Sequence, residues 1–346
     1  MRLLLALALA SSLLASQKNK EPKSEVLPLP KELPMALSAD TANLEFRALQ
    51  LLQSGGLSAQ IRETVSLLLR DTRKENVIKL RAFVAGPGDA RRVQSVVTES
   101  FGEHKLPLPV VTIVEVGALQ DSRAQIAMEA TVSTGKQLNP NGLVFLSGQS
   151  AQNLTAALAR LRTSAASASA GNILRATCFV SRIDGEGAAM QNAMTAALPG
   201  ATATVVQALR DPVDESATCE AIAQANAPTA SAAEPVVLLP QARATVVRTG
   251  QLIFTGLQLS FGNFLDDAQE AFDRLKRAAS AINAVGTPVQ VTAFSPDPSS
   301  MAALRKTTHV PLSIFTVQPV QGLPGADASA GVEEVLAPGI AAPSMQ

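Results

Sequence analysis

Three stretches of the chain alternate apolar and polar residues over about ten positions. They are VIKLRAFVAG at 77–86, ILRATCFVSR at 173–182 and PVQVTAFSPD at 288–297. Alternation over this length is typical of a β-strand with one buried face. Each stretch also arrives at a phenylalanine, which is Phe83, Phe179 or Phe294. The pattern therefore predicts three similar strands.

Helical patterns flank each of these strands. Apolar residues at helical spacing precede them, over 58–71, 150–165 and 266–282. Shorter helical patterns follow them, over 89–101, 187–198 and, in truncated form, 299–306. Two more strands then complete each stretch, and they are predicted at 110–119 and 125–132, at 201–209 and 217–224, and at 313–320 and 330–337.

One order of elements therefore recurs three times: hairpin, helix, strand, helix, strand, strand. GLVFLSGQS at 142–150 and QLIFTGLQLS at 251–260 hold the same place in the second and third copies, and each is a strand that reaches a hydroxyl–glycine step. Segments rich in Ala, Ser and Pro without periodicity separate the copies. We predict units at 35–133, 141–224 and 236–337, a linker at 225–235 and a tail at 338–346.

The N-terminus has the layout of a secretory signal peptide. One arginine, an apolar run and small residues follow one another over residues 1–16, and this run is short for a membrane span. We expect export to the periplasm or the medium, and an uncleaved membrane anchor is the alternative. The charged, proline-rich residues 17–34 are typical of a tether.

Composition limits the partners and the chemistry. Lys+Arg and Asp+Glu both number 29 in a chain of 346 residues, so no basic surplus favours nucleic acid. The chain has neither Trp nor Tyr, so no phenol can serve a site. Cys178 and Cys219 fit either a disulfide in an oxidising compartment or two buried thiols. Two Cys and two His make no metal-ligand cluster, and we expect no cofactor.

The repeated motifs resemble those of the Rid family, the YjgF-like imine and enamine deaminases once described as L-PSP endoribonucleases. The middle unit is the most similar, through LVFLSGQ, ILRATCFVSRID, ATATVVQAL and CEAIA. The first unit is similar through VIKLRAFVAG and AMEATV, and the third through LIFTGLQ and VQVTAF. Three tandem divergent copies would extend the resemblance over roughly residues 35–337.

The resemblance implies an α+β, chorismate-mutase-like fold, in which a mixed sheet carries two helices on one face. Rid domains assemble as homotrimers with ligand sites between subunits. Three fused copies could close as an intramolecular pseudo-trimer, because a sheet with one free apolar face must bury it. We therefore expect a monomer that holds a small molecule in clefts between its units.

Site residues follow from the same resemblance. The family's carboxylate-binding arginine falls at Val111, Ala201 and Leu312, so all three units lack the forked cation that a carboxylate ligand needs. Another arginine, Arg175, Arg182 or Arg210, could take its place. Ser147–Gly148 and Thr255–Gly256 would line clefts, although a tight turn at the strand end is the alternative explanation.

The family's water-positioning glutamate corresponds to Glu129 and Glu220, and to Glu334 or Glu333 in the third unit. Each could instead be an outward, solvated strand residue. The sequence favours an exported protein that binds a small ligand or serves as a scaffold without imine deaminase activity. The alternative is an imine or enamine hydrolase acting on a non-carboxylate substrate, with Glu220 or Glu129 positioning water. An RNase is disfavoured by the neutral charge.

Overall fold

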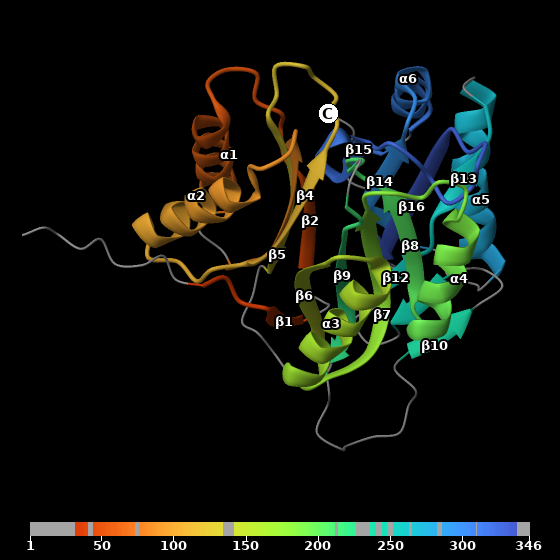
Figure 1. Ribbon diagram of the computed structural model, residues 1–346, viewed down its shortest axis with the longest axis horizontal. Coiled ribbons are helices and arrows are strands. Elements are labelled where there is room, and N and C mark those ends of the chain that lie inside the picture. Colours follow the sequence, from red (N-terminus) through yellow and green to blue (C-terminus); the bar gives the residue numbers. More distant parts are fainter. Residues whose placement is uncertain are drawn as a thin grey trace, which may run out of the picture. The chain divides into compact units, whose positions relative to one another are not determined.

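Three β-sheets with six helices organise the described part of the computed structural model (Figure 1). The structure describes residues 32–40, 44–72, 76–133, 142–211, 214–225, 236–239, 244–247, 252–262, 265–281, 286–308 and 310–337. All of them belong to one unit, Lys31–Gln346. The predicted signal peptide (1–16) and tail (338–346) lie outside the described residues, as do most of the predicted tether and linker.

The first sheet has four strands and carries two helices. Its strand order is β2 (Leu44–Ala48), β5 (Ile126–Ser133), β3 (Asn76–Ala85) and β4 (Val110–Val116). Its helices are α1 (Leu57–Asp71) and α2 (Ala90–Glu103). Strand β3 runs parallel to β4 and antiparallel to β5. Figure 1 shows α1 and α2 together on one side of these strands.

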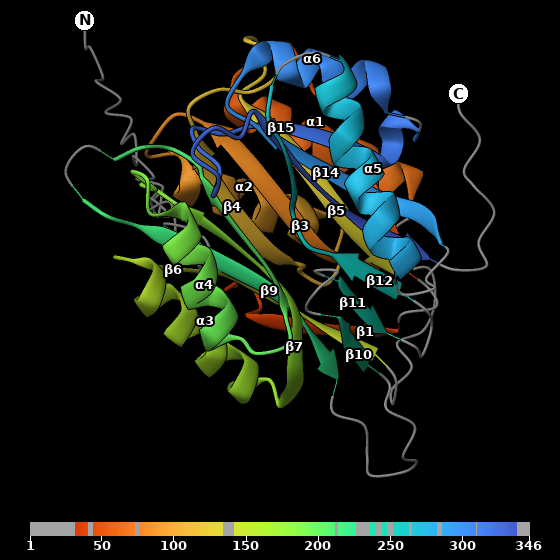
Figure 2. The same cartoon turned by 90° about the vertical axis from the view of Figure 1, so that its right-hand side faces the viewer.

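The second sheet has five strands. Its order is β1 (Ala36–Asp40), β6 (Gly142–Ala151), β9 (Ala217–Ala225), β7 (Ala170–Val180) and β8 (Thr202–Gln207). Its helices are α3 (Leu154–Ser167) and α4 (Gly187–Ala197), which pack on these strands (Figure 2). Strand β1 lies in the sequence range predicted for the first unit, yet it pairs antiparallel with β6.

The third sheet is the largest. Its main path runs through β10 (Val236–Leu239), β11 (Ala244–Val247), β12 (Leu252–Thr255), β16 (Ala330–Ala337), β14 (Thr287–Ser295) and β15 (Phe315–Pro319), with β13 (Gln258–Ser260) also paired to β16. Its helices are α5 (Leu265–Ala281), α6 (Pro298–Thr307) and the short 3₁₀ turn η3 (Leu312–Ile314). The helix α6 has 10 residues, against 14 in α2 and 11 in α4, so it is the shortest of the three, as the sequence predicts.

Helix stripes explain why one face of each sheet is covered. In α1, residues such as Ile61, Val65 and Leu69 recur on one side and are buried against β3 residues such as Leu80. The helix α3 begins where the Asn153 side chain accepts a hydrogen bond from the Ala156 amide. The predicted helices and strands are thus confirmed with shifts of a few residues at their ends, although the strand predicted at 251–260 is divided into β12 and β13. The hairpin predicted to open the first unit is wrong, because β1 and β2 belong to different sheets.

The other face of each sheet is buried as well, as we expect for a sheet with a free apolar face, although alternation alone predicts one buried face for each strand. Phe83, Phe179 and Phe294 come from three different sheets and make edge contacts, with ring centroids 5.7 Å and 6.2 Å apart. They belong to a buried apolar cluster with members from all three sheets. A second such cluster includes Phe46, Phe145 and Phe254. The three sheets therefore meet through their helix-free faces.

Cys178 and Cys219 form a disulfide, so the alternative of two separate thiols is wrong. The two residues stand opposite each other on β7 and β9, and both are fully buried.

Among the described helices, none combines the length and the apolar character that crossing a membrane requires.

Candidate functional site

A charged cluster lies inside the protein where the three sheets meet. Its cations are Lys79, Arg81 and Arg175, and its carboxylates are Glu129, Glu220 and Glu333. All six side chains are at least nine-tenths buried. Three positive and three negative groups cancel, which is the condition under which charges are tolerated away from water.

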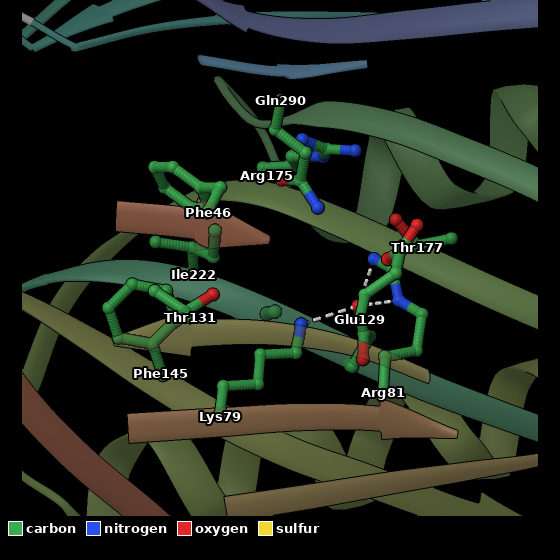
Figure 3. Close-up of a pocket in the computed structure, with 12 residues that line it drawn as sticks. Phe46, Lys79, Arg81, Glu129, Thr131, Phe145, Arg175, Thr177, Ile222 and Gln290 are labelled. Atoms are coloured by element: carbon green, nitrogen blue, oxygen red, sulfur yellow. Dashed lines mark hydrogen bonds and ion pairs between the residues drawn. The ribbon is translucent and has the colours of Figure 1, made fainter. Parts of the chain in front are cut away.

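Most of the bonds in this cluster join different sheets. From β3, the Lys79 ammonium lies 2.6 Å from the Glu220 carboxylate of β9, and Arg81 Nε donates to the same oxygen at 2.9 Å. Arg81 Nη1 also donates to Glu129 on the neighbouring strand β5, at 2.9 Å. Figure 3 shows Lys79 and Arg81 projecting from one strand toward these bonds. A single strand thus holds two carboxylates.

The third sheet takes part in the same way. Arg175, on β7 of the second sheet, forms an ion pair with Glu333 on β16. Thr204 Oγ1 donates to the other oxygen of Glu333 at 2.8 Å, and Thr292 Oγ1 of β14 donates to Glu129 at 3.1 Å. The cluster therefore bonds every pair of sheets.

Charge and burial set the protonation states here. Although burial raises the pKa of Glu220, the positive charges of Arg81 and Lys79 prevail and hold it well below its usual range. Burial is also the main reason that the pKa of Lys79 is lowered to about 8, against the opposing effect of Glu220. Glu220 is therefore an ionised carboxylate at neutral pH, which accepts hydrogen bonds and cannot donate a proton.

A cavity of about 20 Å³ lies within the cluster, and its lining includes Lys79, Arg175, Glu220 and Gln290 (Figure 3). The Glu220 Oε2 atom is buried and has no hydrogen-bond partner among the described residues. This volume accommodates one water molecule, and water normally fills such a space when polar atoms line it. The volume is far too small for an organic substrate.

The strand register shows which glutamate of each sheet stands at the same position, opposite the residue two places before Phe83, Phe179 or Phe294. Arg81 stands opposite Glu129, Thr177 opposite Glu220 and Thr292 opposite Glu333. Glu333, rather than Glu334, is therefore the residue of the third sheet that matches Glu129 and Glu220. The alternative that these glutamates are outward and solvated is wrong for all three.

Glu334 points away from the cluster, as the alternation along a strand requires. It is buried, and burial raises its pKa to about 7 against the opposing charge of Lys276 on α5. A carboxyl group is thus enclosed on the helix-covered side of the third sheet.

The two hydroxyl–glycine steps mark irregular places in the strands. Pairing of β6 with β9 shifts register between Leu146 and Gln149, around Ser147–Gly148. Thr255 is the last residue of β12, and Gly256 lies in the gap before β13. A Cβ at Gly148 would lie 2.9 Å from the methyl groups of Thr112, on β4 of the first sheet, and of Thr218, on the paired strand β9. Close packing from both sides, rather than a turn, therefore explains this glycine. Thr255 is fully buried and donates to the Glu334 carbonyl.

A second, much larger cleft of about 1,250 Å³ lies between the first and third sheets. One wall is the whole of β2 with Leu49, Gln50 and Leu51, backed by α1. The facing wall is η3 with Phe315–Val317 of β15, and the lining is mainly apolar. Leu312 lies here and is 69% exposed, so among the described residues it is one of the few large apolar side chains open to solvent. This cleft is large enough for a ligand.

The placement of Val111 and Ala201 in a ligand cleft needs correction. Val111 packs in the apolar core under α1 and α2, and Ala201 packs in the core of the second sheet and its helices. The strand register also aligns Val111 with Ala203 and Phe315, rather than with Ala201 and Leu312. Neither Ala203 nor Phe315 is an arginine.

Of the three arginines considered as replacements, the structure brings only Arg175 into the interior cluster. Arg182 and Arg210 both pair with Asp184 at the surface. Sequence reasoning missed Lys79 and Arg81. Both residues lie on the same strand face as Phe83, because side chains at every second position point the same way. Two charged residues on a face that has to be buried were the signal that could have identified them.

Within the ranges that the structure describes, no group of three or more His, Cys, Asp or Glu side chains is arranged to hold a metal ion.

No protein-family model and no curated protein matches this sequence. Partial matches occur among solved structures. A crystal structure of chorismatase is 11% identical, covers 88% of this chain and 100% of its own, and has a TM-score of 0.48. The YjgF gene product from E. coli is 20% identical over 28% of this chain and 86% of its own, with a TM-score of 0.25.

The E. coli protein TdcF, solved with bound serine, is 18% identical over 30% of this chain and 90% of its own, with a TM-score of 0.25. The structural neighbours of this chain thus include chorismatase and Rid-family chains, the latter over about 30% of its length.

Proposed function

We propose that this protein is an exported, non-hydrolytic binding protein made of three Rid-like units closed into a pseudo-trimer. In this proposal the units meet through their helix-free sheet faces, and the interior cluster holds them in register. The cleft beside β2 and η3 takes the ligand. The buried disulfide supports an oxidising compartment and hence export.

The observation that carries the proposal is the use of the three glutamates. Glu129, Glu220 and Glu333 each accept hydrogen bonds from a cation or hydroxyl group on another sheet. A carboxylate that positions water for hydrolysis has to reach a substrate, and the cavity beside Glu220 has room for one water alone. These groups therefore bond the sheets to one another and specify how they meet.

The cleft beside β2 supports the binding half of the proposal. Its walls are mainly apolar, and charged groups stand at its rim, among them Arg47, Arg70 and Arg305. Arg47 pairs with Glu45 and Arg70 with Asp71, so the first two cations are partly neutralised. Such a cleft favours ligands with an extended apolar surface over small carboxylates.

One observation favours the alternative, an imine or enamine hydrolase: Glu220 Oε2 has no described partner and lies on a cavity that fits a water molecule. The test is to supply the purified protein with an enzymatically generated 2-imino acid and, separately, with a neutral imine. We expect both to hydrolyse at the rate measured in buffer. Faster hydrolysis that Glu220→Gln abolishes would refute the proposal.

Binding is tested independently with the fluorescent probe 1-anilinonaphthalene-8-sulfonate. We expect saturable binding that Leu312→Asp weakens at least tenfold, because the new charge lies within the apolar cleft. Met35→Asp is the matched control, since Met35 is also an exposed large apolar residue but does not line this cleft. Equal effects of the two changes would count against the cleft.

A further inference from the structure

Strand β2 has an unpaired edge, unlike its counterparts in the other two sheets. In the second sheet, β6 pairs with β9 on one side and with β1 on the other. In the third sheet, β12 pairs with β16 on one side and with β11 on the other. Strand β2 pairs with β5 on one side, and no described residue pairs with its other side. Among the residues that the structure describes, the first sheet therefore has no strand in the place that β1 and β11 take in the other two.

The register of β2 shows which backbone groups are left open. The Leu49 amide donates to the Met128 carbonyl of β5 at 3.0 Å, and Ala48 stands opposite Glu129. Donors alternate in direction along an antiparallel strand, so the amides of Phe46 and Ala48 point away from β5. None of the bonds described for the protein uses them. An edge of this kind is a template for another strand.

The large cleft runs along this same edge. All five residues of β2 line it, together with Pro288 and Val289 at the start of β14, a strand that also contacts β2. Strand β1, the partner of β6, lies against β3 of the first sheet. A strand added to β2 would lie in the corresponding place beside β14. At about 1,250 Å³, the cleft also exceeds the usual range for small-molecule sites, which is about 300–1,000 Å³.

We propose that the ligand of this cleft is an extended polypeptide segment that pairs antiparallel with the free edge of β2. Antiparallel pairing follows the β1–β6 and β11–β12 pairs of the same protein. Side chains at alternate positions of the bound segment face Leu312, Ile314 and Phe315, so these positions carry apolar residues. This inference rests on the proposed binding cleft and names the class of its ligand.

The test begins with a displayed library of random decapeptides, selected against the whole protein. We expect enriched peptides that alternate apolar and polar residues. Each is then synthesised with single N-methyl groups along its backbone. Methylation at every second position should weaken binding at least tenfold and the intervening positions should be tolerated, because only alternate amides of an added strand face β2.

The protein side is tested with Ala48→Pro, which removes an outward amide while leaving the bonds to β5. Ala48→Ser keeps that amide and is the matched control. We expect the proline variant alone to lose peptide binding, with circular dichroism and the melting temperature confirming that it folds.

Failure of the selection, or enriched peptides indifferent to N-methylation, would overturn the peptide proposal. If the peptide tests fail but the fluorescent probe still binds in the cleft, the proposed binding function is supported without the peptide proposal. Loss of probe binding together with peptide binding would reject both.

Discussion

At the scale of single residues, one position on the last strand of each sheet, in chain order, carries a buried glutamate that bonds to other strands. Glu129, Glu220 and Glu333 occupy matching register positions, and each faces cations or hydroxyl groups from other strands. A neighbouring position, Glu334, faces the opposite way and finds no cation in contact among the described bonds. Two adjacent carboxyl groups thus have opposite surroundings because strand side chains alternate.

Glu334 should make stability depend on pH. Burial raises its pKa to about 7 in the folded state, from 4.5 in the unfolded state. Between these values the folded state binds more protons, so its contribution to stability falls as pH rises from about 4.5 to 7. Above pH 7 the buried charge costs up to about 3 kcal/mol.

Glu334→Gln removes that cost. We expect the variant to gain melting temperature relative to the parent at pH 8, and to gain little or nothing at pH 5. Thermal unfolding at the two pH values measures the difference. An equal change at both would show that Glu334 does not titrate in this range.

At the scale of elements, the sequence predicted most helices and strands because their patterns are local. The stripe in α1 and the alternation in β3 can be read from consecutive residues. The pairing of β1 with β6 could not be read, since five residues with weak alternation do not specify a partner about a hundred positions away. Hydrogen bonding between strands is set by the whole sheet.

The interior cluster could not be predicted from local patterns either, because its members are far apart in the sequence. Lys79 and Arg81 sit at polar positions of an alternating strand, which ordinarily face water. Their partner Glu220 is separated from them by 141 and 139 positions. Only the packing of two sheets brings these side chains together, although Phe83 on the same face indicated that the face was buried.

The disulfide is an element-scale constraint between β7 and β9. It closes 41 positions of sequence, for which chain entropy predicts a stabilisation of about 4 kcal/mol. We expect Cys178→Ala with Cys219→Ala to lower the free energy of unfolding in urea by roughly this amount. Because both sulfurs are buried, the parent should resist dithiothreitol until it unfolds. Rapid reduction of the native protein would contradict the buried placement.

At the scale of the whole molecule, one neutral set of buried charges bonds the three sheets to one another. Burying ion pairs does not by itself stabilise a protein, but removing one partner leaves an uncompensated charge and costs about 3–5 kcal/mol. The cluster therefore specifies how the sheets meet, while apolar contacts such as those of Phe83, Phe179 and Phe294 provide most of the favourable energy. A cleft lined by β2 stays open between the first and third sheets.

The central claim is that Glu220 joins sheets instead of activating water, and a double-mutant cycle between Arg81 and Glu220 tests it most directly. Unfolding free energies of Arg81→Met, Glu220→Gln and the combined variant should show coupling of about 2 kcal/mol, within the range known for contacting residues. The exposed pair Arg62–Glu99, treated in the same way, should couple by less than about 1 kcal/mol. Additive effects of the Arg81 and Glu220 changes would contradict the account.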